Sequence, residues 1–233
     1  MHQQNRSTFR VGSYGACLAA VLLTLLAASG AAAGSNVGFE SRCMRLGTEA
    51  KVSVAFEDKP PTRIDSRSLS ELKGLSGARS NPHHNILGLT HAVPSASLKL
   101  TPNMLVDGNG VACVVPSLVL TLGFAEFEVY LAKELKDPCR RRIVEEHENE
   151  HAAVRRNHWR AGARLLETAL RNALAKPSYS SNQDEAVNEM TCRVNDAVGP
   201  LLRQLKDGAI AANQQIDSPA SYQFEANRMR ACP

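Results

Sequence analysis

The chain has 233 residues, of which 43% are apolar and 21% are charged, and its formal net charge is +4. This length is enough for one domain with a sizeable core. The sequence has no lysine-rich block and little aromatic interleaving, which argues against a nucleic-acid-binding protein.

The first 33 residues are typical of a signal peptide. Arg6 and Arg10 give a positively charged start without an acidic residue, and an apolar run extends from Gly15 to Ser29. Ala31-Ala32-Ala33 then offers small residues for cleavage. The run is short for a membrane span, so we expect an exported protein, periplasmic or extracellular, without stable membrane insertion after the leader is removed. An uncleaved N-terminal anchor is the alternative.

Residues 34–233 are expected to form a single zincin-like α+β domain. A β-rich, mainly antiparallel region (40–131) would pack on a long-helix hairpin (138–213), and a polar tail (214–233) would follow. Within the β region, Lys51–Phe56 alternates as a strand, and Ser66–Gly77 predicts a loop or a short helix. Further strands are expected at Ile86–Val93, Ser95–Leu100, Gly110–Val115, Ser117–Leu122 and Phe124–Leu131.

Two turn-like segments interrupt this region. Asp107-Gly108-Asn109-Gly110 predicts a hairpin turn between two of the strands. Asn81-Pro82 precedes a histidine pair, His83-His84, which we interpret as part of a solvated loop rather than as ligands. Phe124–Leu131 leads almost directly into the next helix, an arrangement that zinc peptidases use when a strand edge pairs with an extended peptide.

The stretch Glu145–His151 contains the pattern H-E-x-x-H, with His147, Glu148 and His151 at its fixed positions. Asp137-Pro138 predicts a helix start, and no proline occurs from Cys139 to Leu174. Residues four apart on a helix rise about 6 Å and point the same way, so the two imidazoles can bind one zinc ion. Glu148 would then lie where it can take a proton from a metal-bound water. The plainer alternative is that both histidines are buried core residues.

A second long helix is predicted from about Gln183 to Asn213, after a connector at Lys176–Asn182. Gly199-Pro200 should kink or divide it. Two long helices with a short link suggest an antiparallel hairpin. We expect the tail that follows to be polar and fixed only by Cys232.

Five cysteines follow the leader: Cys43, Cys113, Cys139, Cys192 and Cys232. In an exported protein this number predicts two disulfides and one thiol left over. Spacing does not assign the pairs, and we favour Cys113–Cys139, which would tie the strand region to the start of the motif helix. No C-x-x-C pattern occurs, so a zinc site built from cysteines is not expected.

A catalytic zinc site keeps three protein ligands and one open position, and the third ligand is left open by the sequence. The extended pattern H-E-x-x-H-x-x-G-x-x-H fails at Val154 and Asn157. Four residues are considered instead: His158, Asp207, Glu185 and His91.

Each of these candidates has a weakness. His158 lies about 10 Å along a continuous helix from His151, which is too far for one ion unless the helix bends. Asp207 lies opposite the two histidines only if the two helices form an antiparallel hairpin that turns near Tyr179. The same hairpin places Glu185 near the turn, far from His147. His91 lies in a predicted strand and could equally be an ordinary half-buried histidine. Three further acids of the motif helix, Glu145, Glu146 and Glu150, are expected on its solvated face.

The order of leader, β region, Pro138-Cys139 and an H-E-x-x-H motif on a long helix resembles the exported zinc-dependent proteases of bacteria, a set of uncharacterised zincin-like families. The likeness covers roughly Gly88 to Leu174 and is strongest from Phe127 to His158. It implies that His147 and His151 bind zinc and that Glu148 is the general base or acid. Because the extended pattern is absent, the resemblance assigns no clan, and it supports metal binding better than proteolysis.

Together these features predict an exported zinc-dependent metallopeptidase-like hydrolase that acts on a peptide or protein. Zinc would polarise a water and the scissile carbonyl, while Glu148 accepts the water proton and passes it to the leaving amine. One alternative is a non-catalytic periplasmic or secreted protein that binds a metal or a partner. Another is a metal-dependent hydrolase whose substrate is not a peptide.

Overall fold

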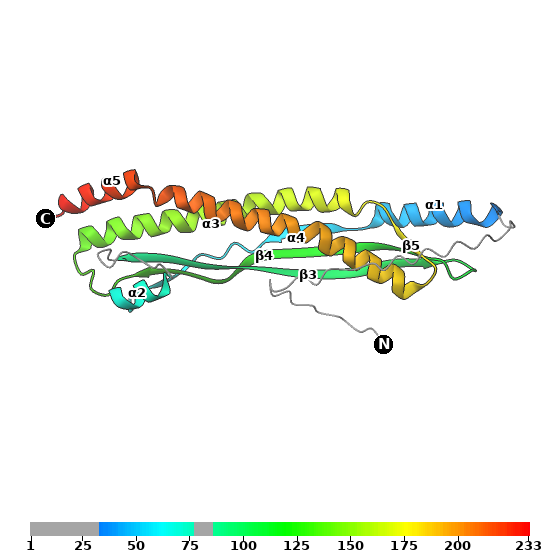
Figure 1. Ribbon diagram of the computed structural model, residues 1–233, viewed down its shortest axis with the longest axis horizontal. Coiled ribbons are helices and arrows are strands. Elements are labelled where there is room, and N and C mark those ends of the chain that lie inside the picture. Colours follow the sequence, from blue (N-terminus) through cyan, green and yellow to red (C-terminus); the bar gives the residue numbers. More distant parts are fainter. Residues whose placement is uncertain (1–32, 77–85) are drawn as a thin grey trace. The chain divides into compact units, whose positions relative to one another are not determined.

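A computed structural model describes residues 33–76 and 86–233, with side chains from residue 38 onward. The predicted leader, apart from Ala33, and the His83-His84 pair lie outside the described residues. The described chain is α+β, as predicted. Its elements are α1 (Ala33–Glu49), β1 (Val52–Phe56), β2 (Thr62–Ile64), α2 (Leu69–Leu75), β3 (Gly88–Val106), β4 (Ala112–Leu131), α3 (Pro138–Ala173), β5 (Ser178–Ser180), α4 (Gln183–Ile216) and α5 (Pro219–Arg230) (Figure 1).

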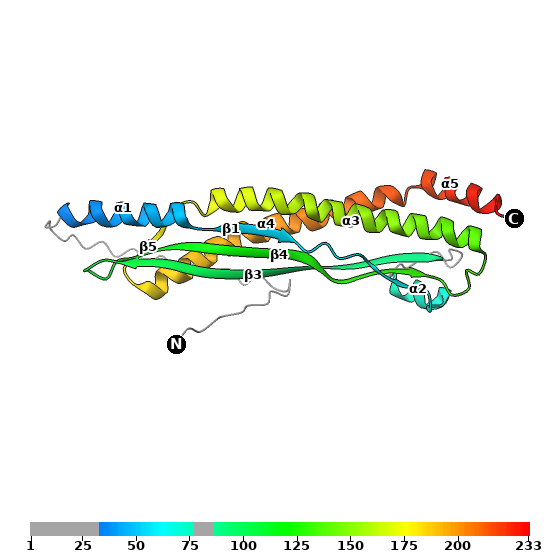
Figure 2. The same cartoon turned by 180° about the vertical axis from the view of Figure 1, so that it is seen from behind.

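The sheet is built around β4, which pairs with each of the other four described strands. β2 pairs with β4 in parallel, and β5 pairs with it antiparallel. β1 lies alongside β4 (Figure 2) and also runs parallel to it, because Lys51 bonds to Leu118 and Glu57 bonds to Leu122. The prediction of a mainly antiparallel region is therefore not confirmed. Parallel partners are joined by long crossovers, which leave no short-range signal in the sequence.

β3 and β4 are each longer than the strands expected from the sequence. The breaks that the sequence suggested at Pro94, Pro116 and Gly123 all lie inside continuous strands. The predicted turn is confirmed, since the amide of Asp107 bonds to the carbonyl of Val111 and Gly110 adopts a positive φ of 85°. A positive φ costs glycine little, which explains its place in this turn.

α3 begins where the sequence predicted. The Asp137 carboxylate accepts a hydrogen bond from the amide of Arg140 at 2.7 Å, and Pro138 is the first helical residue. α4 runs through Pro200 as a single helix. The predicted plain hairpin of these two helices is not confirmed, because their connector contains β5, which joins the sheet. None of the described helices has the length and apolar character that a membrane span requires.

The described chain divides into two compact units, and β3, β4, α3 and α4 each contribute to both. The first unit contains the described part of Met1–Ala55, with Ala96–Thr121 and Arg164–Leu201. In its core, Ala112 and Val114 of β4 pack against Ala186 and Met190 of α4. A disulfide between Cys43 and Cys113 fixes α1 to β4 in the same unit.

The second unit contains Phe56–Ser95, Leu122–Ala163 and Leu202–Pro233. Leu72 of α2, Leu131 of β4 and Val144 of α3 belong to one of its apolar clusters. α3 and α4 approach closely here, because a Cβ on Gly162 would lie 2.1 Å from Leu205 Cδ1. This contact accounts for the one glycine in α3.

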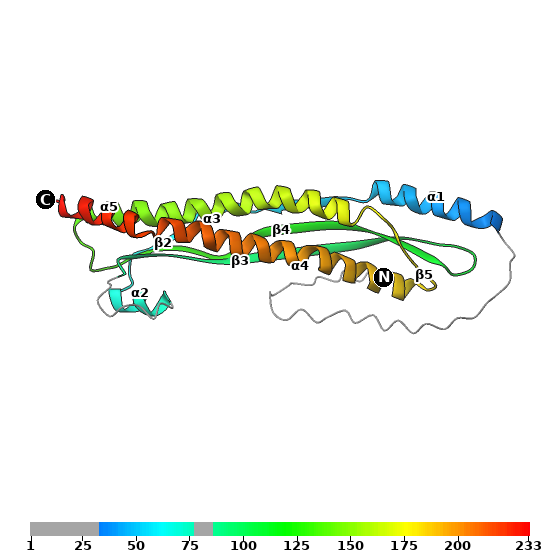
Figure 3. The ribbon, with the colours of Figure 1, turned by 45° about the horizontal axis from the view of Figure 1, so that its top comes forward.

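The predicted polar tail is the helix α5, which lies beside the first turns of α3 in both views (Figures 1 and 3). Ser218 caps it, Pro219 is its first residue, and none of its side chains is fully buried. A disulfide joins Cys139 to Cys232, and Arg228 forms an ion pair with Glu146 at 2.5 Å. The tether at Cys232 is thus confirmed, whereas the prediction that nothing else fixes the tail is wrong.

The disulfides correct two predictions from the cysteine count. The favoured pair Cys113–Cys139 is wrong, because each of these residues bonds to another cysteine. The predicted leftover thiol is also absent from the described residues, where no cysteine is free and Cys192 is disulfide-bonded as well. Disulfides are typical of proteins that fold outside the reducing cytoplasm.

Candidate metal centre

His147 and His151 lie one turn apart on the face of α3 that packs into the second unit. Their side chains are buried, and their Nε2 atoms approach to 3.1 Å. Ile143 and Val144 precede them on the same buried face, so the apolar stripe of the helix places both imidazoles inside. The pattern H-E-x-x-H therefore brings the two rings together as predicted.

A third potential ligand comes from the short link between α4 and α5. Asp217 Oδ1 lies 3.1 Å from His151 Nε2 and 3.4 Å from His147 Nε2. Three ligands of a tetrahedral zinc ion, each about 2.0–2.1 Å from it, are separated from one another by about 3.3–3.4 Å. The three atoms are therefore spaced as ligands of one small ion, and the carboxylate is the partly exposed member of the group.

The tautomer of His151 follows from its partner Asn213. The Asn213 Nδ2 group donates to the carbonyl of Ala209 at 2.8 Å, so its Oδ1 must face the imidazole, with Nδ1 of His151 at 2.9 Å. An amide oxygen only accepts, and Nδ1 therefore carries the proton. In a neutral ring this leaves Nε2 with a free lone pair, directed at Asp217 and His147.

His147 has a carboxylate in the corresponding position. Its Nδ1 lies 2.5 Å from Glu225 Oε1 of α5, although the angle is poor for a hydrogen bond and Nδ1 has no other described partner. A buried N–H beside a carboxylate is strongly favoured over two opposed lone pairs. Nε2 of His147 is consequently also an acceptor in the neutral ring.

Asp217 is held by Tyr222, whose hydroxyl donates to Oδ1 at 2.7 Å. Burial, and then this hydrogen bond, raise the pKa of Tyr222 well above its usual value, so the phenol remains a donor. Two imidazole lone pairs and a carboxylate oxygen thus converge within 3.4 Å of one another. Such a set of acceptors is stable when they share a cation, and carboxylates or amides behind ligating histidines are the usual support of a metal site.

Glu148 is buried beside this group. Its Oε2 and its backbone carbonyl both lie 2.8 Å from the single hydroxyl of Thr90. Burial raises the pKa of Glu148 to about 7, although the hydrogen bond with Thr90 and the charge of His151 lower it. A carboxyl group that titrates near neutrality is suited to general acid–base chemistry.

Gly88 makes room for this carboxylate. A Cβ at this position would lie 2.6 Å from Val144 Cγ1 and 2.7 Å from both Cγ and Oε1 of Glu148. The start of β3 can therefore pass close to α3 only with glycine here.

The histidines, Glu148 and Asp217 line one cavity of about 660 Å³ within the second unit. The start of β3 forms one wall and the start of α5 forms another. Leu87, Leu89, Val144 and Met229 contribute apolar surface, and Arg155 adds a positive charge. The volume is in the range of a small-molecule or peptide site.

None of the four residues considered as a third ligand belongs to this group. His158 bonds through Nε2 to the carbonyl of Leu205 at 3.0 Å, and His91 lies 3.2 Å from Glu126. Asp207 is exposed on α4. Glu185 accepts a hydrogen bond from Ser180 at 2.5 Å at the start of α4.

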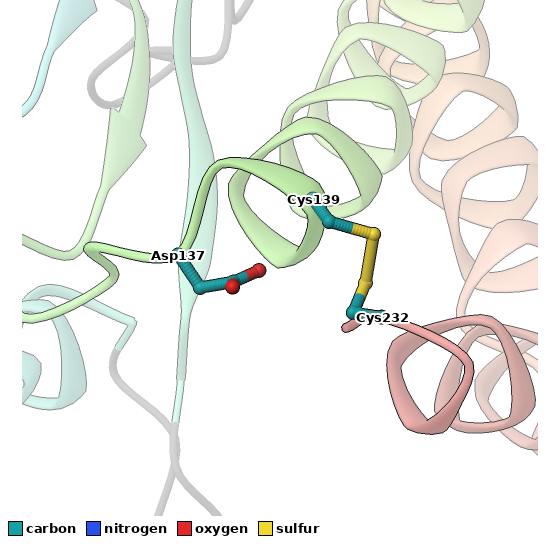
Figure 4. A group of neighbouring side chains, drawn as sticks. All are labelled: Asp137, Cys139 and Cys232. Carbon is teal, nitrogen blue, oxygen red and sulfur yellow. A yellow bond between two sulfur atoms is a disulfide. The ribbon is translucent and has the colours of Figure 1, made fainter.

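The surplus acids of α3 are outside the cavity, as expected. Glu146 and Glu150 are exposed, and Glu145 pairs with Arg63. A second acid–cysteine group, Asp137 with Cys139 and Cys232, is not a metal site, because its two thiols form a disulfide (Figure 4).

Sequence reasoning missed Asn213, Asp217, Tyr222 and Glu225, all of which come from the end of α4 or from the tail. α5 has no fully buried residue, so its sequence carries no apolar stripe. The signal that could have found it is Ser218-Pro219, an N-cap followed by proline like Asp137-Pro138. Comparisons of the chain with protein-family models, with curated proteins and with solved structures found no match. The geometry of this centre therefore carries the functional conclusion.

Proposed function

We propose that the protein is an exported zinc-dependent hydrolase of the zincin-like metallopeptidase type. The observation that carries the proposal is the convergence of His147 Nε2, His151 Nε2 and Asp217 Oδ1 beside the buried carboxyl group of Glu148. Two imidazoles and a carboxylate, with one position left open, are a ligand set of catalytic zinc. Non-haem iron uses the same donors in a wider, octahedral arrangement, and elemental analysis distinguishes the two metals.

Bound zinc would supply Lewis acidity, lowering the pKa of a water molecule and polarising a carbonyl oxygen. Glu148 would accept the proton of the attacking water as its oxygen bonds to the carbonyl carbon. As the C–N bond breaks, Glu148 would return this proton to the leaving amine. Thr90 would hold the carboxyl group in place throughout.

A peptide substrate is supported by β3, which forms one wall of the cavity. Among the described strands β3 pairs with β4 alone, so the backbone groups on its other edge have no strand partner. An extended peptide can add to such an edge through main-chain hydrogen bonds. Residues Gly88–Thr90 of this strand lie at the cavity that holds Glu148, and a bound peptide would thus pass the proposed ligands.

Export is supported by the disulfides Cys43–Cys113 and Cys139–Cys232 and by the predicted leader.

The test uses the zinc-loaded protein and a mixture of unstructured peptides, with products read by mass spectrometry. Glu148→Gln should keep about one zinc per chain and lose cleavage by about 100-fold or more, since one general base contributes on the order of 10²–10⁴ in rate. Glu150→Gln is the matched control on the exposed face of α3 and should cleave normally. Equal cleavage by Glu148→Gln and wild type would overturn the assignment of Glu148. Zinc binding without cleavage of any peptide would favour the non-catalytic metal-binding protein.

A further inference from the structure

Arg155 lies one helical turn after His151 on α3 and lines the same cavity as the three proposed ligands. Its side chain is half-buried, and its Nε atom is enclosed without a hydrogen-bond partner among the described residues. Burial lowers the pKa of Arg155, while the charges of Asp217 and Glu148 raise it. Both carboxylates line the same cavity as Arg155, but neither forms an ion pair with it among the described residues.

Other arginines of α3 form ion pairs with carboxylates. Arg141 pairs with Asp65 at 2.7 Å, and Arg156 pairs with Asp58 at 2.6 Å. These two side chains are 26% and 31% exposed, and their carboxylate partners lie at the surface, where such pairs add little stability. Arg155 is half-buried as well, but its enclosed Nε has no hydrogen-bond partner and its guanidinium forms no ion pair within the described residues. A partly desolvated charge without a partner is costly. This contrast indicates that the guanidinium of Arg155 is available to bind an anionic group of a ligand.

The geometry limits what that group can be. A guanidinium is planar and presents a fork of donors that matches a carboxylate. Long side chains on a helix lean toward its N-terminus, so that of Arg155 leans toward His151, whose Cα lies about 6 Å along the axis. In a peptide, the C-terminal carboxylate carbon is three bonds from the preceding carbonyl carbon and within about 4 Å of it. A peptide whose last carbonyl approaches the proposed ligands would therefore bring its carboxylate to Arg155.

We propose that Arg155 binds the C-terminal carboxylate of the substrate, so that the site removes C-terminal residues from peptides. This inference rests on the proposed function and specifies its substrate class. Arg155 is then a specificity-determining residue that holds the substrate, while the ligands of the zinc ion and Glu148 remain as described.

The test is a binding measurement by calorimetry with three probes on the zinc-loaded protein. N-acetyl-phenylalanine carries the α-carboxylate, its amide lacks it, and N-acetyl-glutamic acid α-amide carries only a side-chain carboxylate. Wild type should bind N-acetyl-phenylalanine about tenfold or more tightly than the amide, as expected for a charged hydrogen-bonded pair. Arg155→Gln should abolish this preference while keeping its zinc content and thermal melting point. Arg155→Lys should restore part of the preference, and Arg156→Gln should leave it intact.

Equal binding of the acid and the amide by wild type would overturn the proposal, and so would a full preference in Arg155→Gln. If the glutamic acid α-amide bound as tightly as N-acetyl-phenylalanine, Arg155 would recognise side-chain carboxylates, and C-terminal specificity would be overturned. Zinc content is measured on the same samples. A protein that binds no zinc contradicts the proposed function, whereas one that binds zinc and shows no acid preference contradicts only the role of Arg155. The comparison is repeated on zinc-free protein, where α3 still positions the guanidinium and the preference should persist.

Discussion

Glu148 is held in an environment that should cost the protein stability, and the cost depends on pH. Burial raises its pKa from 4.5 to about 7 in the metal-free protein. Because the folded-state pKa is the higher one, the folded protein binds the proton more tightly than the unfolded chain does. The buried carboxyl group therefore costs little below about pH 4.5, and the penalty grows as the pH rises toward about 7. Its full size is about 3 kcal/mol of unfolding free energy, at 1.36 kcal/mol for each pH unit between the two values.

Glu148→Gln keeps the shape of the side chain and has no charge to bury. We expect this variant of the zinc-free protein to be more stable than wild type by up to about 3 kcal/mol at pH 8, and by much less at pH 5. Urea unfolding followed by circular dichroism at both pH values measures the difference. Glu146→Gln is the control. Arg228 lowers the pKa of Glu146, so this carboxylate stabilises the folded protein at pH 8 instead of destabilising it. It should be slightly less stable than wild type at pH 8. If Glu148→Gln were no more stable than wild type at pH 8, or more stable by the same amount at both pH values, burial of the Glu148 charge would not destabilise the folded protein.

Three further outcomes are expected. Gly88→Ala should lower the unfolding free energy by about 1–3 kcal/mol in urea titrations, since its Cβ would overlap Val144 and Glu148; an unchanged midpoint would contradict the close packing. Asn213→Leu removes the acceptor behind His151 and should weaken zinc binding about 10- to 100-fold in chelator competition; unchanged affinity would mean that Asn213 does not support the ligand. Cys232→Ser opens the disulfide that holds α5 and should cost about 2–4 kcal/mol of unfolding free energy. It should also weaken zinc binding, because Asp217 and Glu225 lose their tether. Zinc affinity equal to that of wild type would show that α5 stays docked without the bond.

The two histidines were predictable because the chemistry of the motif and the helix agree. Asp137-Pro138 marks the helix start, and the buried face of α3 carries His147 and His151 at the spacing that one ion requires. These signals are local, since they depend on residues within a few turns of one another. Glu148 follows from the same pattern, although its buried partner Thr90 does not.

The third ligand could not be found in this way, because it depends on the register between two helices. An antiparallel hairpin that turns near Tyr179 would place Leu205 and Asp207 opposite the two histidines. In the structure His158 contacts Leu205, and His151 contacts Asn213, about two turns further along α4. Asp217 lies beyond that point, and the helix that follows it buries none of its side chains fully. Neither the register nor the docking of α5 leaves a periodic trace in the sequence.

The proposed zinc site can be tested by the metal content of the purified mature protein, measured by elemental analysis after zinc is offered and excess is removed. We expect about one zinc per chain in wild type, none or little in His147→Ala, and a clear loss in Asp217→Ala, while Asp207→Ala retains the ion. A folded wild-type protein that takes up no zinc would contradict the zinc site and leave the histidines as core residues. Full occupancy in Asp217→Ala would show that the ion is held without this carboxylate.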